Sequence, residues 1–230
     1  MERSINLDEI SDGRLYDLND MARADCGSCE GCSACCSGMG ASVVLDPWDI
    51  CQLTVGLGLT FQQLMADRLE LNMVDRIILP NLKMAGERER CPFLNPQERC
   101  AIHAIRPGFC RLFPLGRLYE GRSFRYFLQV HECGKADRSK VKIRKWLDTP
   151  QLREHERFVA DWHYFLKDME RGMKGDEGRM RTVDMYILNH FFAAPYDPGE
   201  GFYGQFGRRL AEAGLFAEGQ GITLGTVDDR

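Results

Sequence analysis

The sequence lacks the features that mark several large classes of protein. No run of apolar residues approaches the roughly 18 that a membrane-spanning helix requires. The first ten residues, MERSINLDEI, include acidic side chains and no apolar stretch, so we expect no signal peptide. The formal net charge of −4 argues against a general affinity for nucleic acid, and no Walker A, H-E-x-x-H or G-x-S-x-G string occurs. We therefore expect a cytoplasmic protein whose partner is neither a membrane nor nucleic acid.

Cysteine is missing from the C-terminal part of the chain, because all ten cysteines lie between positions 26 and 133. Five of them fall in the string CGSCEGCSACC at 26–36, where small residues let the backbone fold tightly around a centre. Stable disulfides are rare in a reducing cytoplasm, and a chain of 230 residues can bury a core without cross-links. We therefore interpret these cysteines as metal ligands rather than as a disulfide framework.

The spacing of the first cluster indicates which metal it would hold. It contains the C-x2-C-x2-C-x3-C run of bacterial ferredoxins, at Cys26, Cys29, Cys32 and Cys36. The proline that usually follows the fourth cysteine is replaced by Ser37, although a Cys-Pro pair occurs at Cys91. Structural zinc sites usually pair two C-x2-C knuckles, whereas 8, 9 and 22 residues separate the later cysteines. The spacing favours an iron–sulfur cluster of the 4Fe–4S type, with Zn²⁺ as the alternative.

Local patterns in the cysteine-rich part predict short helices and strands. We expect a helix over 14–24, a brief strand over 43–45, and a hairpin over 115–130 that turns at Glu120-Gly121. Asp46-Pro47 is typical of a helix start.

Farther along, helical spacing predicts three amphipathic helices whose apolar stripes cover a core. These stripes are Leu152, Val159, Trp162, Leu166 and Met169; Met180, Val183, Ile187 and Phe191; and Phe202, Phe206 and Leu210. We predict a mainly α fold with small irregular β hairpins, a minor α+β type, in which a cysteine-rich metal-centred domain precedes C-terminal helices. The predicted parts are an N-terminal helical arm (1–25), a cysteine-cluster metal-binding domain (26–145), a C-terminal helical segment (146–218) and a flexible tail (219–230).

Three motifs, in order, resemble a known family. They are CSACC with its preceding C-x2-C, CPFL at 91–94, and CAIHAIRPGFCRLFP at 100–114. They are similar to those of the CxxCxxCC or YkgJ-type cysteine cluster proteins, a family described as a zinc- or iron-chelating domain. The matching residues are Cys29, Cys32, Cys35, Cys36, Cys91, Pro92, Phe93, Leu94, Cys100, Ile102, Arg106, Pro107, Cys110, Arg111, Phe113 and Pro114. The resemblance covers residues 26–135 and departs at His103, where the family usually has tyrosine.

This resemblance implies metal binding by cysteine thiolates. The candidate ligands are Cys29, Cys32, Cys35, Cys36, Cys91, Cys100, Cys110 and Cys133, which stands where the family often has a last cysteine before a glycine. Cys26 is an additional candidate. Eight thiols are enough for two four-thiolate sites or for one site with spares. Flagellin lysine-N-methylases carry a similar cluster, which links the family to iron–sulfur binding by analogy.

Several side chains near the candidate ligands have expected supporting roles. Arg106 and Arg111 flank Cys110, and we expect them to offset thiolate charge and to hydrogen-bond sulfur or carbonyl groups. The alternative is that they hold an anionic substrate beside the centre. We expect His103 and His131 to support ligands rather than to bind metal.

Cys51, in contrast, lies at helical spacing from apolar residues, and we interpret it as a small core side chain rather than a ligand. Residues 135–145 hold six basic side chains, which we interpret as a solvated face, with an acidic protein partner as the alternative.

Two functions stay open at this point. The cluster could be a working cofactor for redox or modification chemistry, or the metal could only cross-link an interaction module that has no catalytic activity. An open coordination position would favour the first, and closure by four cysteines the second. The sequence assigns neither a substrate nor a reaction.

Overall fold

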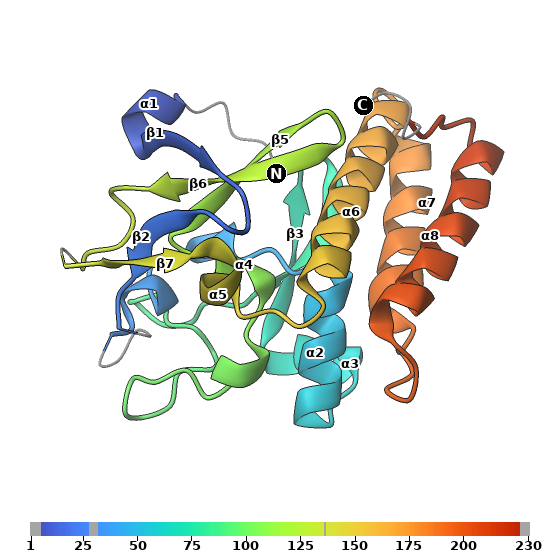
Figure 1. The fold of residues 1–230 in the computed structure, drawn as a ribbon. Helices are drawn as coiled ribbons and strands as arrows, with labels where there is room; N and C mark the ends of the chain where they lie inside the picture. The colour runs from blue at the N-terminus through green and yellow to red at the C-terminus, as the bar shows by residue number, and fades with distance from the viewer. Residues whose placement is uncertain (1–5, 28–31, 136, 226–230) are drawn as a thin grey trace.

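The fold is of the α+β type, with small antiparallel sheets and, towards the C-terminus, consecutive helices (Figure 1). The computed structural model describes residues 6–27, 32–135 and 137–225. Its strands are β1 (Ser11–Tyr16), β2 (Met21–Asp25), β3 (Leu69–Val74), β4 (Ile77–Leu82), β5 (Leu115–Glu120), β6 (Ser123–Gln129) and β7 (Ser139–Lys142). Its α-helices are α1 (Leu7–Ile10), α2 (Pro47–Leu57), α3 (Phe61–Asp67), α4 (Gly108–Leu112), α5 (Ile143–Leu147), α6 (Leu152–Gly172), α7 (Glu177–Ile187) and α8 (Phe202–Gly219). Short 3-10 turns η1 (Ala34–Cys36), η2 (Gly40–Ser42) and η3 (His103–Ile105) and a π-helical segment η4 (Leu188–Ala193) complete it.

The first two strands pair with strands from much later in the chain. β1 joins β6 and β5 in a sheet of order β1-β6-β5, and β2 pairs with β7 in a two-stranded ribbon. The helix that the sequence predicts over 14–24 is therefore wrong. Ala22 and Ala24 alternate with exposed residues and are 1% and 0% exposed, which is the period-2 pattern of a half-buried strand. Pairing with distant strands outweighs the weak local preference of this segment.

Local signals place the next elements correctly. Asp46 caps α2: its side chain accepts the backbone N–H of Asp49, and the side chain of Asp49 accepts that of Asp46 in return. The hairpin over 115–130 is confirmed, with Glu120 paired to Ser123 across its turn. The strand expected over 43–45 is reduced to a single bridge between Val44 and Asn81.

The predicted helical stripes form the main apolar core. Phe158, Trp162 and Phe191 are all less than 7% exposed, and the rings of Trp162 and Phe191 lie 4.9 Å apart between centroids. The helices α6, α7 and α8 gather on one side of the molecule (Figure 1). None of the helices in the described part of the chain combines the length and the apolar character needed to cross a bilayer.

This core also extends into the cysteine-rich part. Leu53 and Leu64, from α2 and α3, belong to the same buried cluster as the aromatic residues of α6 and η4. The predicted division after residue 145 stays a prediction, and the shared core means that the helices and α2 stabilise one another. The segment 219–230 is predicted to be a flexible tail, but Ile222 is 2% exposed and the N–H of Gly225 donates to Asp168 at 2.8 Å.

Candidate metal centre

Backbone hydrogen bonds bring the first cysteine loop to the second group of cysteines. The N–H of Cys91 donates to the carbonyl of Cys36 at 2.8 Å, and the N–H of Gly38 donates to the carbonyl of Glu89 at 3.1 Å. Ser37 and Arg90 form an antiparallel bridge between these bonds. The two halves of the cysteine motif are therefore held together by main-chain pairing.

Cys91 and Cys100 lie in two turns with the same local geometry. Each thiol accepts the backbone N–H two residues ahead, from Phe93 and from Ile102. The N–H of Ala101 donates to the carbonyl of Phe93 at 2.8 Å, which ties the turns together. Because an N–H group that points at sulfur favours the thiolate, both turns are suited to metal ligation.

Cys35 and Cys110 complete a group of four thiols, which we call the cysteine centre: Cys35, Cys91, Cys100 and Cys110. Burial raises the pKa of the Cys110 thiol well above its ordinary value, and the neighbouring Cys91, Asp49, Cys35 and Cys100 raise it further. A hydrogen bond with Cys36 raises the pKa of Cys35, and burial adds to it. These thiols are close enough to oppose one another's ionisation, and a bound cation would reverse that repulsion.

The donor set fits a soft metal. Four thiolates suit Zn²⁺ or an iron–sulfur cluster, because both take sulfur ligands in tetrahedral geometry. Within residues 6–27, 32–135 and 137–225, however, no three Cys, His, Asp or Glu side chains stand in a ready-made coordination shell. The fold therefore gathers the thiols without setting them in final ligand geometry.

Two of the remaining candidate ligands, Cys26 and Cys133, lie next to one end of the β2–β7 ribbon or in the connection that leads to it. Cys26 directly follows β2, where Asp25 pairs with Ser139, the first residue of β7. Cys133 lies in the connection that leads from β6 to this same end of the ribbon, and Cys32 is half-buried. Cys29 lies outside the described residues.

Cys51 lies away from this group, in the main core. It is 8% exposed on α2, and burial raises its pKa to about 11. Such a thiol stays protonated at neutral pH, as a small core side chain does.

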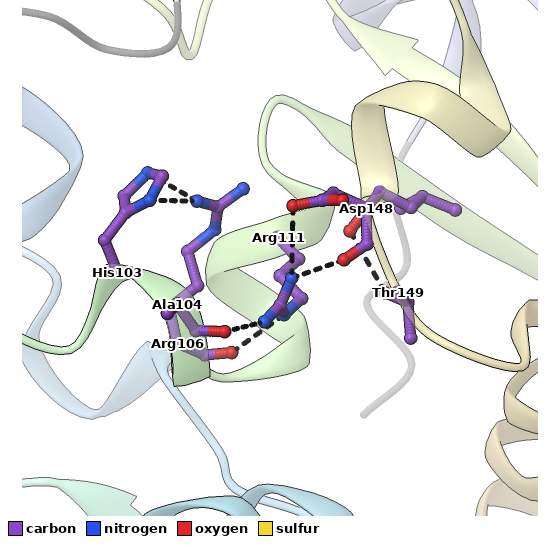
Figure 2. Close-up of polar contacts among 7 residues, drawn as sticks. His103, Ala104, Arg106, Arg111, Asp148 and Thr149 are labelled. Carbon is purple, nitrogen blue, oxygen red and sulfur yellow. Dashed lines mark hydrogen bonds and ion pairs between the residues drawn. The ribbon is translucent and has the colours of Figure 1, made fainter. Parts of the chain in front are cut away.

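Arg111 holds the turn before Cys110 through backbone carbonyl groups (Figure 2). Its guanidinium group donates to the carbonyls of Arg106 at 3.1 Å and of Asp148 at 2.6 Å, and also to that of Ala104. The side chain is 5% exposed, and it lies 5.7 Å from the ring centroid of Trp48. Of the hydrogen bonds expected for Arg111, the structure shows those to carbonyl groups.

The charge of Arg106 influences two thiols of the cysteine centre. Its charge is among the influences that lower the pKa of Cys35 and of Cys100. Its guanidinium group donates to the ring of the exposed His103, at 2.9 Å to Nδ1 (Figure 2). His131 is exposed in the loop after β6. Both arginines therefore favour thiolate charge, Arg106 at Cys35 and Cys100 and Arg111 at Cys110.

Sequence reasoning missed Asp49, which is 2% exposed. Its carboxylate Oδ1 accepts the N–H of Gly108 at 2.7 Å, two residues before Cys110. Asp49 follows the Asp46-Pro47 helix start that the sequence predicts, and nothing local shows that it reaches α4.

The lysines of the basic stretch are solvated, while apolar side chains at its C-terminal end are buried. Lys140 and Lys142 are exposed on β7, as expected, whereas Ile143 and Leu147 are buried residues of α5 itself. The indole N–H of Trp146 donates to the carbonyl of Phe113 at 3.2 Å, which joins this segment to the end of α4.

An α+β fold whose main-chain pairing gathers cysteines from separate loops defines a class of thiol-rich chelating protein. The comparison with known families agrees with this class. The chain belongs to the CxxCxxCC family, described as a "putative zinc- or iron-chelating domain", whose model matches residues 28–144. No curated protein and no solved structure matches the chain.

Proposed function

We propose that the protein binds an iron–sulfur cluster of the 4Fe–4S type through the cysteine centre and uses it in redox or modification chemistry. Family membership supports metal chelation in general. The observation that carries the proposal is the approach of Cys35, Cys91, Cys100 and Cys110 from four separate segments. Two of these thiols receive backbone N–H groups, and hydrogen bonds to sulfur are a main means of tuning iron–sulfur clusters.

The other cysteines extend this proposal. Cys36 is hydrogen-bonded to Cys35 and is a candidate ligand of the same centre. Cys29, Cys32 and Cys133, with Cys26 as an additional candidate, remain proposed ligands that could complete this centre or form a second one at the ribbon end. We place the protein in the cytoplasm, where these thiols stay reduced.

Zinc is the second candidate, and one observation favours it. Cys91, Cys100 and Cys110 pack against the main apolar core, as the ligands of a closed structural site do. In this alternative the metal stabilises an interaction module and has no catalytic role.

Purification without oxygen distinguishes the two metals. We expect brown protein with acid-labile sulfide and on the order of four iron atoms per cluster. Cys110→Ala should lower the iron and sulfide content. Stoichiometric zinc without sulfide, after expression with ample iron, would contradict the iron–sulfur proposal and support the zinc alternative.

A further inference from the structure

The short helix α4 has no side-chain cap of its own. It spans only Gly108–Leu112, its N-cap is Pro107, and no side chain from this segment accepts the first N–H groups. Free N–H groups at the start of a buried helix need acceptors from elsewhere. Because α4 carries Cys110, whatever satisfies these groups also fixes the position of that thiol.

The acceptor comes from α2, far away in the sequence. The Oδ1 atom of Asp49 accepts the N–H of Gly108 at 2.7 Å in a fully buried contact, while its Oδ2 atom accepts the N–H of Asp46 at 3.1 Å. Both oxygens are therefore used, and the carboxylate is itself fixed by the capping box of α2. One side chain thus joins a helix of the main core to the helix that carries Cys110.

The nearby charges of Arg117 and Arg111 favour the carboxylate of Asp49, but that carboxylate does not help the neighbouring thiol to ionise. The negative charge of Asp49 is one of the influences that raise the pKa of Cys110, so it opposes formation of the thiolate ligand. The benefit of Asp49 must then come from the direction of its hydrogen bond. An asparagine keeps one acceptor oxygen for the N–H of Gly108 but loses the acceptor for the N–H of Asp46, so it should preserve the function only in part.

From these contacts we propose that Asp49 is a positioning residue for the metal centre, which holds the first turn of α4 so that Cys110 can bind metal. This inference rests on the proposed function, because it assumes that Cys110 is a ligand. Supporting groups of this kind, when removed, typically weaken metal affinity by about 10- to 100-fold.

Asp184 offers a matched control elsewhere in the molecule. It is 6% exposed, and its Oδ1 accepts the N–H of Ile78 at 3.0 Å, which joins α7 to β4. Replacing Asp184 by alanine removes a buried carboxylate–backbone bond of the same kind that does not involve the segment carrying Cys110. A general loss of stability would therefore affect both variants, whereas a positioning effect would affect only Asp49.

The experiment is a titration of reduced, metal-free protein with Co²⁺ under anaerobic conditions. The intensity of the thiolate-to-cobalt charge-transfer band reports the number of bound thiolates, and competition with Zn²⁺ gives affinity. We expect Asp49→Ala to weaken Co²⁺ binding by about 10- to 100-fold and to reduce the charge-transfer band. We expect Asp49→Asn to lose less affinity than Asp49→Ala, because it keeps an acceptor for Gly108, and Asp184→Ala to keep the wild-type affinity and spectrum.

Other outcomes would contradict either the positioning role of Asp49 or the proposed function. Wild-type affinity and spectrum in Asp49→Ala would overturn the positioning role, as would equal losses in Asp49→Asn and Asp49→Ala. No Co²⁺ binding by the wild type, together with anaerobically purified protein that contains neither iron and sulfide nor zinc, would overturn the proposed function and this inference with it. If Asp49→Ala fails to fold, Asp49→Leu tests the same bond, because leucine is close to aspartate in shape and has no acceptor for the N–H of Gly108. Wild-type binding in that variant would also overturn the positioning role.

Discussion

Arg111 gives a prediction whose size can be worked out from its contacts. Its buried guanidinium group donates to three backbone carbonyls, and Arg111→Ala would leave all three without this donor (Figure 2). A buried polar group that loses its partner costs about 1–3 kcal/mol. These contacts are only part-buried, so we take the lower end of this range for each. The three together then give a loss of roughly 3 kcal/mol, which is a large part of the 5–15 kcal/mol by which folded proteins are typically stable.

Lysine distinguishes this role from simple charge neutralisation. Arg111→Lys keeps the positive charge, but one ammonium group cannot reach three carbonyls that lie around a planar fork. If the carbonyl contacts are what matters, Arg111→Lys should lose most of the stability that Arg111→Ala loses. The control is Arg144→Ala, because within the described residues its exposed guanidinium group donates only to the side chain of Asn19, at 3.4 Å, and we expect a change within about 0.5 kcal/mol.

The assay is urea unfolding of metal-loaded protein, followed by circular dichroism, with metal content measured on the same samples. The reasoning is refuted if Arg111→Lys unfolds at the wild-type urea concentration while Arg111→Ala does not. That result would mean that the charge of Arg111, rather than its geometry, supports the centre.

Three further predictions concern other parts of the molecule. Cys51→Ala should keep full metal content and cost only about 1 kcal/mol of stability, measured by metal analysis and urea unfolding; loss of metal would show that the ligand assignment is wrong. Metal removal should speed hydrogen exchange first in 26–45 and 91–133, while helical circular dichroism largely survives; uniform loss of protection would show one cooperative unit. His155, whose pKa burial lowers to about 3, binds a proton more readily when unfolded, so stability should fall as pH drops from about 6.5 towards 3. His155→Gln should reduce this slope by up to about 1.4 kcal/mol per pH unit, and an unchanged slope in acid unfolding would contradict the burial argument.

Elements with local signals could be predicted, and those fixed by distant pairing could not. Asp46-Pro47 marks the start of α2 correctly, and the apolar stripes give α6, α7 and α8. The sequence did not predict the hairpin of β3 and β4, because its turn is formed by Asp75 and Arg76, with φ of 47° and 66°. Glycine or asparagine is the usual signal for such a turn.

The same limit applies to the candidate site. The motifs identify which cysteines are candidates, because their spacing is local. The grouping of Cys35 with Cys91, Cys100 and Cys110 depends on backbone bonds between residues 36–38 and 89–91, which no short pattern encodes. The contact between Asp49 and α4 is even harder to predict from the sequence, since the partner of Asp49 is a main-chain N–H group.

The pairing of β2 with β7 has a consequence for the order of events on the ribosome. The cysteine loop directly follows β2, but its partner strand begins only at Ser139. At about 5–20 residues per second, the first five thiols emerge on the order of 5 to 20 seconds before that strand is made. During this interval they form a dense local chelator that lacks its later partners. On the proposed ligand assignment, metal that arrives early would be captured by the wrong set of sulfurs, and correct assembly would depend on when metal is delivered as well as on which metal it is.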